Sequence, residues 1–288
     1  MSPATPSAHW EKLLVCTDGS PDSEGAIRAA LELARSPGST LYLLEVLTYI
    51  PYELQSPDLL PPPAINLDLL AVQEKVVRER LDAWKAEAAE AGVNLAPRVR
   101  TSNSPFDGIM EEIAELKPHL VIMGRHGFTG LTRLLMGSVT ARIIGHSPVN
   151  VLVVPKEVPL GFKKILIASD DSPFSAAAFQ EALSITQRMG STLMGIAVAQ
   201  INGEVKTAQE VVRKLAAEAQ RRGVPLETAV PLGPAYEAII KVAKTKQVNL
   251  IILGSHGRTG LRRLLMGSVA ERVIGQAPCA VLVVKKAD

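Results

Sequence analysis

Residues 129–139 read TGLTRLLMGSV and residues 259–269 read TGLRRLLMGSV, so the second copy begins 130 positions after the first (259 − 129). The copies differ only where Thr132 is replaced by Arg262. Each copy follows an apolar run and another glycine pair, and together they give the spacing Gly-x2-Gly-x9-Gly-Ser twice. A lone glycine pattern is weak, but a repeated one predicts a duplicated local structure. Its residues are Gly124, Gly127, Gly137 and Ser138, then Gly254, Gly257, Gly267 and Ser268.

The chain around these motifs also repeats. It has 288 residues, where a domain typically holds about 100–150. Near the start it reads Asp18-Gly19-Ser20-Pro21, and later Asp170-Asp171-Ser172-Pro173. We therefore predict one domain at residues 1–155, a linker at 156–162 and a second domain at 163–288.

The first half is the longer one. From the first Asp to the first motif glycine the spans are 106 residues (124 − 18) and 84 residues (254 − 170). The surplus of 22 residues (106 − 84) lies almost wholly in the proline-rich stretch at 48–68. We interpret this stretch as an insertion. It could serve as a lid, a partner loop or a spacer, and the sequence does not choose among them.

The alternation of apolar runs and helical patterns predicts the fold class. Near-continuous apolar runs indicate strands covered on both faces, and intervening helices indicate parallel connections. The prediction is α/β: two tandem doubly wound, Rossmann-like domains, each a five-stranded parallel sheet with helices on both faces. In the first half, strands are expected at 12–17, 40–46, 93–100, 119–123 and 149–154. Helices are expected at 21–35, 69–91, 104–116 and 138–145. The second half repeats this order.

One of these helices has a specific predicted face. In the helix at 69–91, the inward side chains are expected to be Ala71, Val72, Val76, Leu81, Trp84 and Ala88.

Composition excludes several classes of protein. A net charge of +2 gives no basic excess for nucleic acid or an anionic membrane. No apolar run approaches the roughly 18 residues that span a bilayer, and the first ten residues lack the features of a signal peptide. Cys16 and Cys279 lie in apolar runs, so both are expected to be buried. We expect a cytoplasmic protein.

The glycine loops have the chemistry of an anion site. Gly124 and Gly127 allow close backbone approach after a strand. Gly137 and Ser138 precede a helix, whose N-terminal N–H groups favour phosphate. Ser138 either caps that helix or donates its hydroxyl to the phosphate. In the second half Ser268 and Glu271 resemble a capping box.

Other readings of the loops are excluded or left open. The leucines between the glycines, with Met136, are expected to pack beneath the loop. His126 and His256 have no neighbouring ligands in the sequence, so no metal site is predicted. No P-loop, dinucleotide fingerprint or nucleophile elbow is present. A loop of turn and cap glycines without ligand is the alternative.

These residues resemble the ATP-binding signature of the universal stress proteins in their tandem two-domain form. The resemblance covers about residues 11–286. It implies that Asp18, with the backbone near Thr17 and Val46, holds adenine and ribose. The phosphates would be held by Gly124, preceded by Met123, and by Gly127, Gly137, Ser138, Val139 and Thr140. The matching second set is Ser169, Asp170, Val198, Leu253, Gly254, Gly257, Gly267, Ser268 and Val269. Asp171 in place of Gly19 and Ala270 in place of Thr140 set the second site apart.

Three functions remain open at this point. The first is a stress-response or signalling protein that binds ATP, with a divalent cation such as Mg²⁺, without efficient turnover. The second is a slow ATPase or nucleotidyl-transfer enzyme. The third is a nucleotide-free structural or chaperone-like module. By the same resemblance, the apolar strands at 149–154 and 280–284 are expected to join the two halves as an intrachain pseudo-dimer. A homodimer of chains is a further arrangement.

Overall fold

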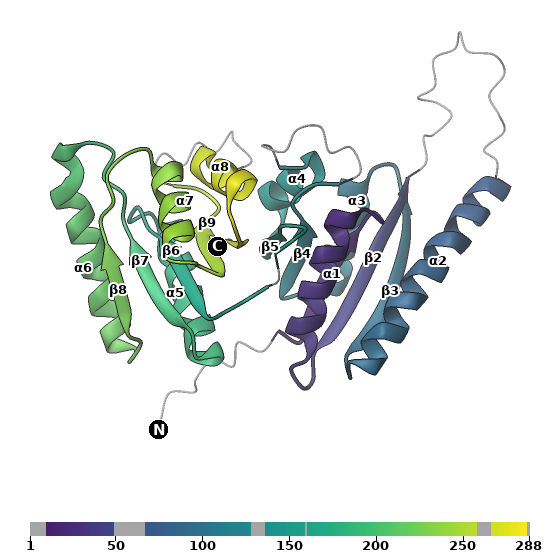
Figure 1. Cartoon of the computed structure of the whole chain (residues 1–288). Helices are drawn as coiled ribbons and strands as arrows, with labels where there is room; N and C mark the ends of the chain where they lie inside the picture. The colour runs from purple at the N-terminus through teal and green to yellow at the C-terminus, as the bar shows by residue number, and fades with distance from the viewer. Residues whose placement is uncertain (1–9, 49–66, 128–135, 159, 258–265, 287–288) are drawn as a thin grey trace, which may run out of the picture.

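The repeat in the sequence folds into two similar halves that share one sheet (Figure 1). The computed structural model describes residues 10–48, 67–127, 136–158, 160–257 and 266–286 of the chain. The insertion predicted at 48–68 and the leucines of the repeated stretch lie almost entirely outside these residues. None of the described helices is long and apolar enough to cross a membrane.

The first half alternates strands and helices as predicted. Its strands are β1 (Lys12–Thr17), β2 (Thr40–Thr48), β3 (Asn94–Ser102), β4 (Leu120–Gly124) and β5 (Asn150–Val154). Its helices are α1 (Pro21–Ala34), α2 (Leu67–Glu90), α3 (Pro105–Leu116) and α4 (Ser138–His146).

The second half repeats this order with shorter strands. Its strands are β6 (Lys164–Ala168), β7 (Thr192–Ile196), β8 (Leu226–Ala229), β9 (Leu250–Gly254) and β10 (Ala280–Val284). Its helices are α5 (Pro173–Met189), α6 (Val205–Arg221), α7 (Ala235–Thr245) and α8 (Ser268–Gln276).

Local sequence explains where several helices begin. Ser20, Ser104 and Ser172 are N-caps in extended backbone, and each side chain accepts the N–H of the residue three positions later. A proline stands at the first helical position each time, where its fixed φ suits the helix and its missing N–H costs nothing. The Ser-Pro pairs therefore favour the start of α1, α3 and α5 at these positions through local contacts.

The sheet has the order β3-β2-β1-β4-β5-β10-β9-β6-β7-β8. Every neighbouring pair is parallel except β5 and β10, which run antiparallel with Leu152 opposite Leu282. Two hydrophobic clusters cover the sheet, one on each face, and each contains residues of both halves. Along β5, alternate residues enter opposite clusters: Leu152 and Val154 on one face, Val151 and Val153 on the other. The α/β prediction with mostly parallel strands is thus confirmed, and the hydrophobic core continues across the β5–β10 junction.

The predicted inward face of α2 is only partly correct. Leu81 and Ala88 are fully buried, and Trp84 packs against the core. Val72 and Val76, however, are 59% and 53% exposed, and Ala71 is exposed as well. The buried face runs through Val77, Leu81, Trp84 and Ala88, with spacings of four, three and four residues. Val72 and Val76 lie about one residue off this stripe, so they do not enter the hydrophobic core.

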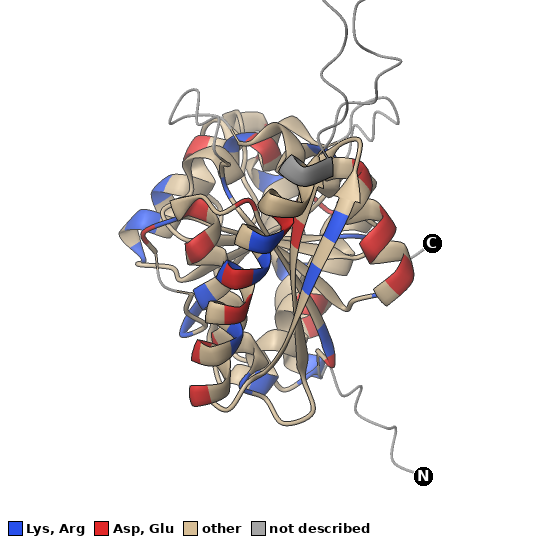
Figure 2. Cartoon of the chain, turned by 90° about the vertical axis from the view of Figure 1, so that its right-hand side faces the viewer, with Lys and Arg blue, Asp and Glu red and all other residues tan. Residues whose placement is uncertain are grey.

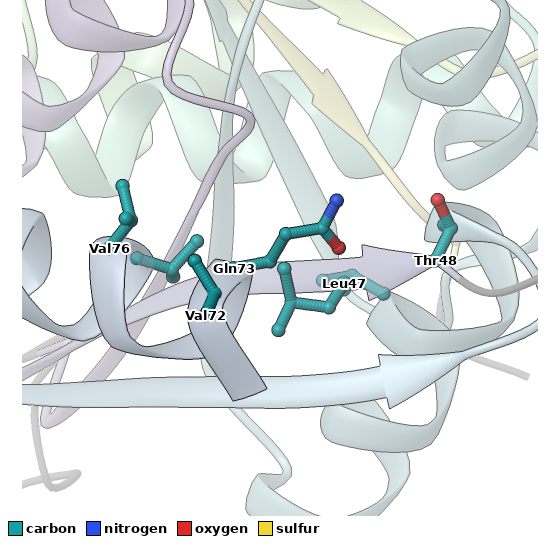
Figure 3. A pocket seen from close by; sticks show the side chains of 7 residues that line it. Leu47, Thr48, Val72, Gln73 and Val76 are labelled. Atoms are coloured by element: carbon teal, nitrogen blue, oxygen red, sulfur yellow. The ribbon is translucent and has the colours of Figure 1, made fainter. Parts of the chain in front are cut away.

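The exposed valines form one wall of a shallow groove between α2 and the end of β2. Figure 3 shows Val72, Gln73 and Val76 of α2 facing Leu47 and Thr48 of β2. Val46 and Val77 complete the lining, and the groove holds about 380 Å³. Among the described residues that line the groove, none has a charged side chain.

Candidate nucleotide site

The ends of β1, β2 and β4 and the start of α4 meet around a cavity of about 250 Å³ in the first half. Because these strands are parallel, their carboxyl ends share one edge of the sheet, where ligands bind in open α/β folds. The structure places all ten first-half candidates in this lining: Thr17, Asp18, Val46, Met123, Gly124, Gly127, Gly137, Ser138, Val139 and Thr140.

Asp18 is held at the rim by the turn that follows β1. Its Oδ1 accepts the N–H of Ser20 at 3.0 Å, and the N–H of Gly19 donates to Thr17 Oγ1 at 3.0 Å. Gly19 adopts φ +76°, a left-handed conformation that glycine adopts without strain. These bonds fix the carboxylate before any ligand arrives.

Gly127 makes room for this carboxylate. A Cβ at Gly127 would lie 2.6 Å from Asp18 Oδ2, well inside van der Waals contact. The same relation holds in the second half, where a Cβ at Gly257 would lie 2.7 Å from Asp170 Oδ2. The second glycine of each motif therefore allows the loop to pass against the aspartate that follows β1 or β6.

Glycine is needed at position 124 for a different reason, which is the close approach of a helix outside the ligand cavity. A Cβ at Gly124 would lie 2.9 Å from the carbonyl oxygen of Asp22. A Cβ at Gly254 would lie 2.7 Å from the carbonyl carbon of Phe174. Asp22 and Phe174 belong to the first turns of α1 and α5. The first glycine of each motif thus lets a helix start against the end of β4 or β9.

The start of α4 corrects one prediction. Gly137, not Ser138, is the N-cap, and its carbonyl accepts the N–H of Ala141 at 3.0 Å. Ser138 is therefore the first helical residue and does not cap the helix. The N–H groups of the first turn have no partner within the helix, and the helix dipole favours an anion beside them.

The capping box predicted in the second half is wrong for the same reason. Gly267 is the N-cap of α8, and its carbonyl accepts the N–H of Glu271 at 3.0 Å. Ser268 thus lies at the first helical position and Glu271 at the fourth, which is one residue too late for a capping box.

Thr140 ties the helix to the strand. It is buried, and its hydroxyl donates to the carbonyl of Gly124 at 3.1 Å. A backbone hydrogen bond also links the start of the helix to the loop after β4: the N–H of Gly137 donates to the carbonyl of Arg125 at 2.9 Å. Ala270 replaces Thr140 in the second half and lacks the hydroxyl.

Six lining residues were not among the candidates: Cys16, Ser23, Leu44, Pro105, Ile109 and His126. Leu44 could have been found from strand periodicity, since it shares the face of Val46 two residues away. Ile109 lies on the apolar stripe of α3. Burial raises the pKa of the Cys16 thiol far above its ordinary value. Cys16, Leu44 and Ile109 belong to one hydrophobic cluster, which gives the cavity an apolar wall.

His126 and its second-half counterpart His256 have different neighbours. Nδ1 of His126 lies 3.6 Å from Asp22 Oδ1. In the second half Phe174 stands in place of Asp22, and its ring centroid lies 5.1 Å from that of His256. Among the residues that the structure describes, no group of three or more His, Cys, Asp or Glu side chains is placed to hold a metal ion.

The second-half candidates repeat the backbone arrangement. Asp170 Oδ1 accepts the N–H of Ser172 at 3.1 Å, and the N–H of Asp171 donates to Ser169 Oγ at 3.2 Å. Asp171 adopts φ +66°, which is strained for a residue with a Cβ, and its carboxylate pairs with Lys214 at 2.5 Å. Leu253 is buried in β9, Val269 is 38% exposed, and Val198 lies two residues beyond the end of β7.

Comparisons with known proteins agree with this architecture. The model of the universal stress protein family matches residues 9–155 and 161–285. Universal stress protein E of Salmonella typhi is 26% identical over 306 aligned residues, which cover 96% of this chain and 95% of that protein. Universal stress protein MJ0531 of Methanocaldococcus jannaschii is 35% identical over 141 residues, or 43% of this chain and 83% of that protein.

Solved structures show the same fold. A universal stress protein from Archaeoglobus fulgidus superposes with a TM-score of 0.76 at 22% identity and covers 96% of this chain and 99% of its own. One from Pseudomonas aeruginosa gives a TM-score of 0.70 at 21% identity, with 96% and 94% covered.

Proposed function

Because the chain belongs to the universal stress protein family, we propose that it binds adenine nucleotide in a stress-response or signalling role without efficient turnover. The observation that carries this proposal is the first-half cavity, which gathers one rim carboxylate, two glycine turns and a helix N-terminus around an apolar wall. An adenine ring needs the apolar wall, and phosphates need the N–H groups.

Each part of the cavity has a role in this proposal. Leu44, Val46 and Ile109 contact the base, and Asp18 accepts hydrogen bonds from the base or ribose. The phosphates lie against Gly127 and the first turn of α4, where N–H groups and the helix dipole favour negative charge. A Mg²⁺ ion, when bound, would neutralise phosphate charge.

The second half would hold a second, non-equivalent nucleotide. Supporting this are the matched turn at Asp170, the matched gap between Gly257 and Asp170, and Gly267 at the N-cap of α8. Asp171 adds negative charge near the expected phosphates, although Lys214 pairs with it. We expect the second site to bind more weakly.

We further propose that the two halves, domains at 1–155 and 163–288 with a linker at 156–162, act as an intrachain pseudo-dimer. The antiparallel pairing of β5 with β10 and the buried residues on both faces of that junction support it. The interspersed basic and acidic segments on the side that carries β3 and α2 (Figure 2) do not suggest a nucleic-acid surface there.

Equilibrium titration with ATP, combined with native mass spectrometry, tests the proposal. We expect up to two nucleotides per chain, and binding lost in the double variant Gly127→Val plus Gly257→Val. Gly203→Val is the matched control, because a Cβ at Gly203 meets nothing closer than 4.0 Å. Failure of the wild type to bind, or undiminished binding in the double variant, would falsify nucleotide binding at these loops.

Turnover separates the binding protein from the enzyme. Phosphate release by the purified protein is expected to equal a buffer blank. Turnover above the blank that Asp18→Ala abolishes would instead assign a slow ATPase. Mass spectra without nucleotide and without binding on addition of ATP would favour a structural module. The same spectra report whether chains form a homodimer.

A further inference from the structure

Arg125 lies inside the first glycine loop but contacts the other half of the chain. Its backbone N–H donates to the carbonyl of Val154 at 3.2 Å, and its own carbonyl accepts the N–H of Gly137 at 2.9 Å. The residue thus joins the end of β5 to the N-cap of α4. Any movement of Arg125 therefore moves the phosphate-facing part of the first cavity.

The side chain of Arg125 ends on α8. Nη1 donates to the carbonyl of Gly275 at 3.3 Å and Nη2 to the carbonyl of Ala277 at 2.6 Å. Ala277 is the C-cap of α8, so these carbonyls belong to the C-terminal end of the helix, where a cation stabilises the helix dipole. The guanidinium is largely desolvated there, which lowers the pKa of Arg125, but the group stays charged.

The other end of α8 is the second glycine loop. Gly267 caps the helix, and Ser268 is its first residue. A helix of nine residues is about 14 Å long. One short rigid element thus runs from the expected phosphate position of the second half to the glycine loop of the first.

A contact in the opposite direction, from the second half to the C-terminal end of α4, also exists. It does not start from a glycine loop. Lys285, just after β10, donates from Nζ to the carbonyls of Ile144 and Gly145 at the C-terminal end of α4. The residue of the second loop that corresponds to Arg125 is Ser255, whose Oγ lies 3.2 Å from Nδ1 of its neighbour His256. Among the loop residues that the structure describes, Arg125 is the one whose side chain donates to the opposite helix.

We propose that Arg125 couples the two sites of one chain, so that nucleotide bound at the second-half loop raises the affinity of the first-half cavity. The coupling rests on the nucleotide binding proposed above. Phosphate at the N-terminus of α8 and guanidinium at its C-terminus stabilise the same helix dipole. A helix ordered by phosphate holds the acceptors of Arg125 in place, so the first loop loses less conformational entropy on binding. By linkage, the first site affects the second equally.

Site-resolved titration of the full chain with ATP tests the coupling. Methionine methyl groups labelled with ¹³C report each site, since Met123 lines the first cavity and Met266 precedes Gly267. Because the first site fills before the weaker second site, the coupling is measured on the second site. Blocking the first site with Gly127→Val is expected to raise the second-site Kd about fivefold, the lower end of typical allosteric coupling. With Arg125→Met in the background, the same block should change the second-site Kd less than about twofold.

Two further variants guard against a general loss of structure. Arg125→Lys keeps a cation that can donate to the same carbonyls, so part of the fivefold effect should return. Arg142→Met removes an arginine of α4 that stacks on Phe106 within the first half, and the full effect should persist. A second-site Kd that does not change on the block, or a block effect that survives Arg125→Met, overturns the coupling alone. If ATP moves neither methionine signal, the proposed function fails and the coupling with it.

Discussion

The two glycines of the first loop should respond differently to an added methyl group. Gly124→Ala places a Cβ 2.9 Å from the Asp22 carbonyl oxygen, which is backbone and cannot rotate away. Gly127→Ala places a Cβ 2.6 Å from Asp18 Oδ2, the far end of a side chain. Since non-bonded atoms prefer about 3.5 Å or more, α1 must retreat by roughly 0.5 Å in the first case and the carboxylate by almost 1 Å in the second.

These displacements give different costs. Shifting a packed helix typically costs about 1–3 kcal/mol, and the rigid backbone wall places Gly124→Ala near the upper end. Moving Asp18 breaks the 3.0 Å hydrogen bond from Ser20 N–H. That bond involves a charged group but lies at an exposed residue, so we expect Gly127→Ala to cost about 1 kcal/mol.

A double-mutant cycle identifies the clashing atom. In an Asp18→Ala background the cost of Gly127→Ala should fall to near zero, while the cost of Gly124→Ala should not change, because its clash is with backbone. Urea unfolding followed by far-UV circular dichroism measures each free energy of unfolding. Gly203→Ala is the control and should lie within about 0.5 kcal/mol of wild type. An equal cost of Gly127→Ala with and without the Asp18 carboxylate would refute the placement of Oδ2.

Two more predictions concern the helix caps and the half-buried Lys285. Ser104→Ala removes an N-cap and should lower the free energy of unfolding by about 1 kcal/mol, whereas Ser138→Ala, one residue inside its helix, should change it by less than about 0.5 kcal/mol while weakening ATP binding. Equal losses of stability in a urea titration would contradict the cap assignment. Burial lowers the pKa of Lys285 to about 8, so the unfolded chain binds the proton more tightly and stability attributable to Lys285 should rise between pH 8 and the ordinary lysine value. The gain in urea midpoint from pH 7.5 to 9.5 should be smaller in Lys285→Met, and an equal gain would count against it.

The strands and several helix starts could be predicted from sequence because their causes are local. Apolar runs fixed the strands to within a few residues, and Ser20-Pro21 and Ser104-Pro105 each carry a cap and a preset φ within two positions. The duplicated glycine spacing also identified the first-half candidates that the fold brings to one cavity. These candidates come together because the parallel strands of a doubly wound sheet end at the same edge.

Other features depended on contacts that no local pattern encodes. The apolar residues of α2 allowed more than one inward face, and only packing on β2 and β3 selects the stripe that leaves Val72 exposed. Gly137 and Ser138 are both acceptable N-caps by residue type. In the structure Gly137 is the N-cap. Its N–H donates to the carbonyl of Arg125, and this bond holds Gly137 against the loop.

The sequence by itself determined that this protein has two α/β halves, each with an aspartate after its first strand and glycine turns before its last helix. Only the tertiary structure decided what the first glycine of each motif is for, since the Asp22 carbonyl that it accommodates lies 102 positions earlier (124 − 22). It alone also brought Arg125 to Gly275 and Ala277, 150 and 152 positions away. The physical reason is that propensity and capping act over a few residues, whereas steric fit and the capping of a helix by the opposite half exist only after β5 and β10 have paired.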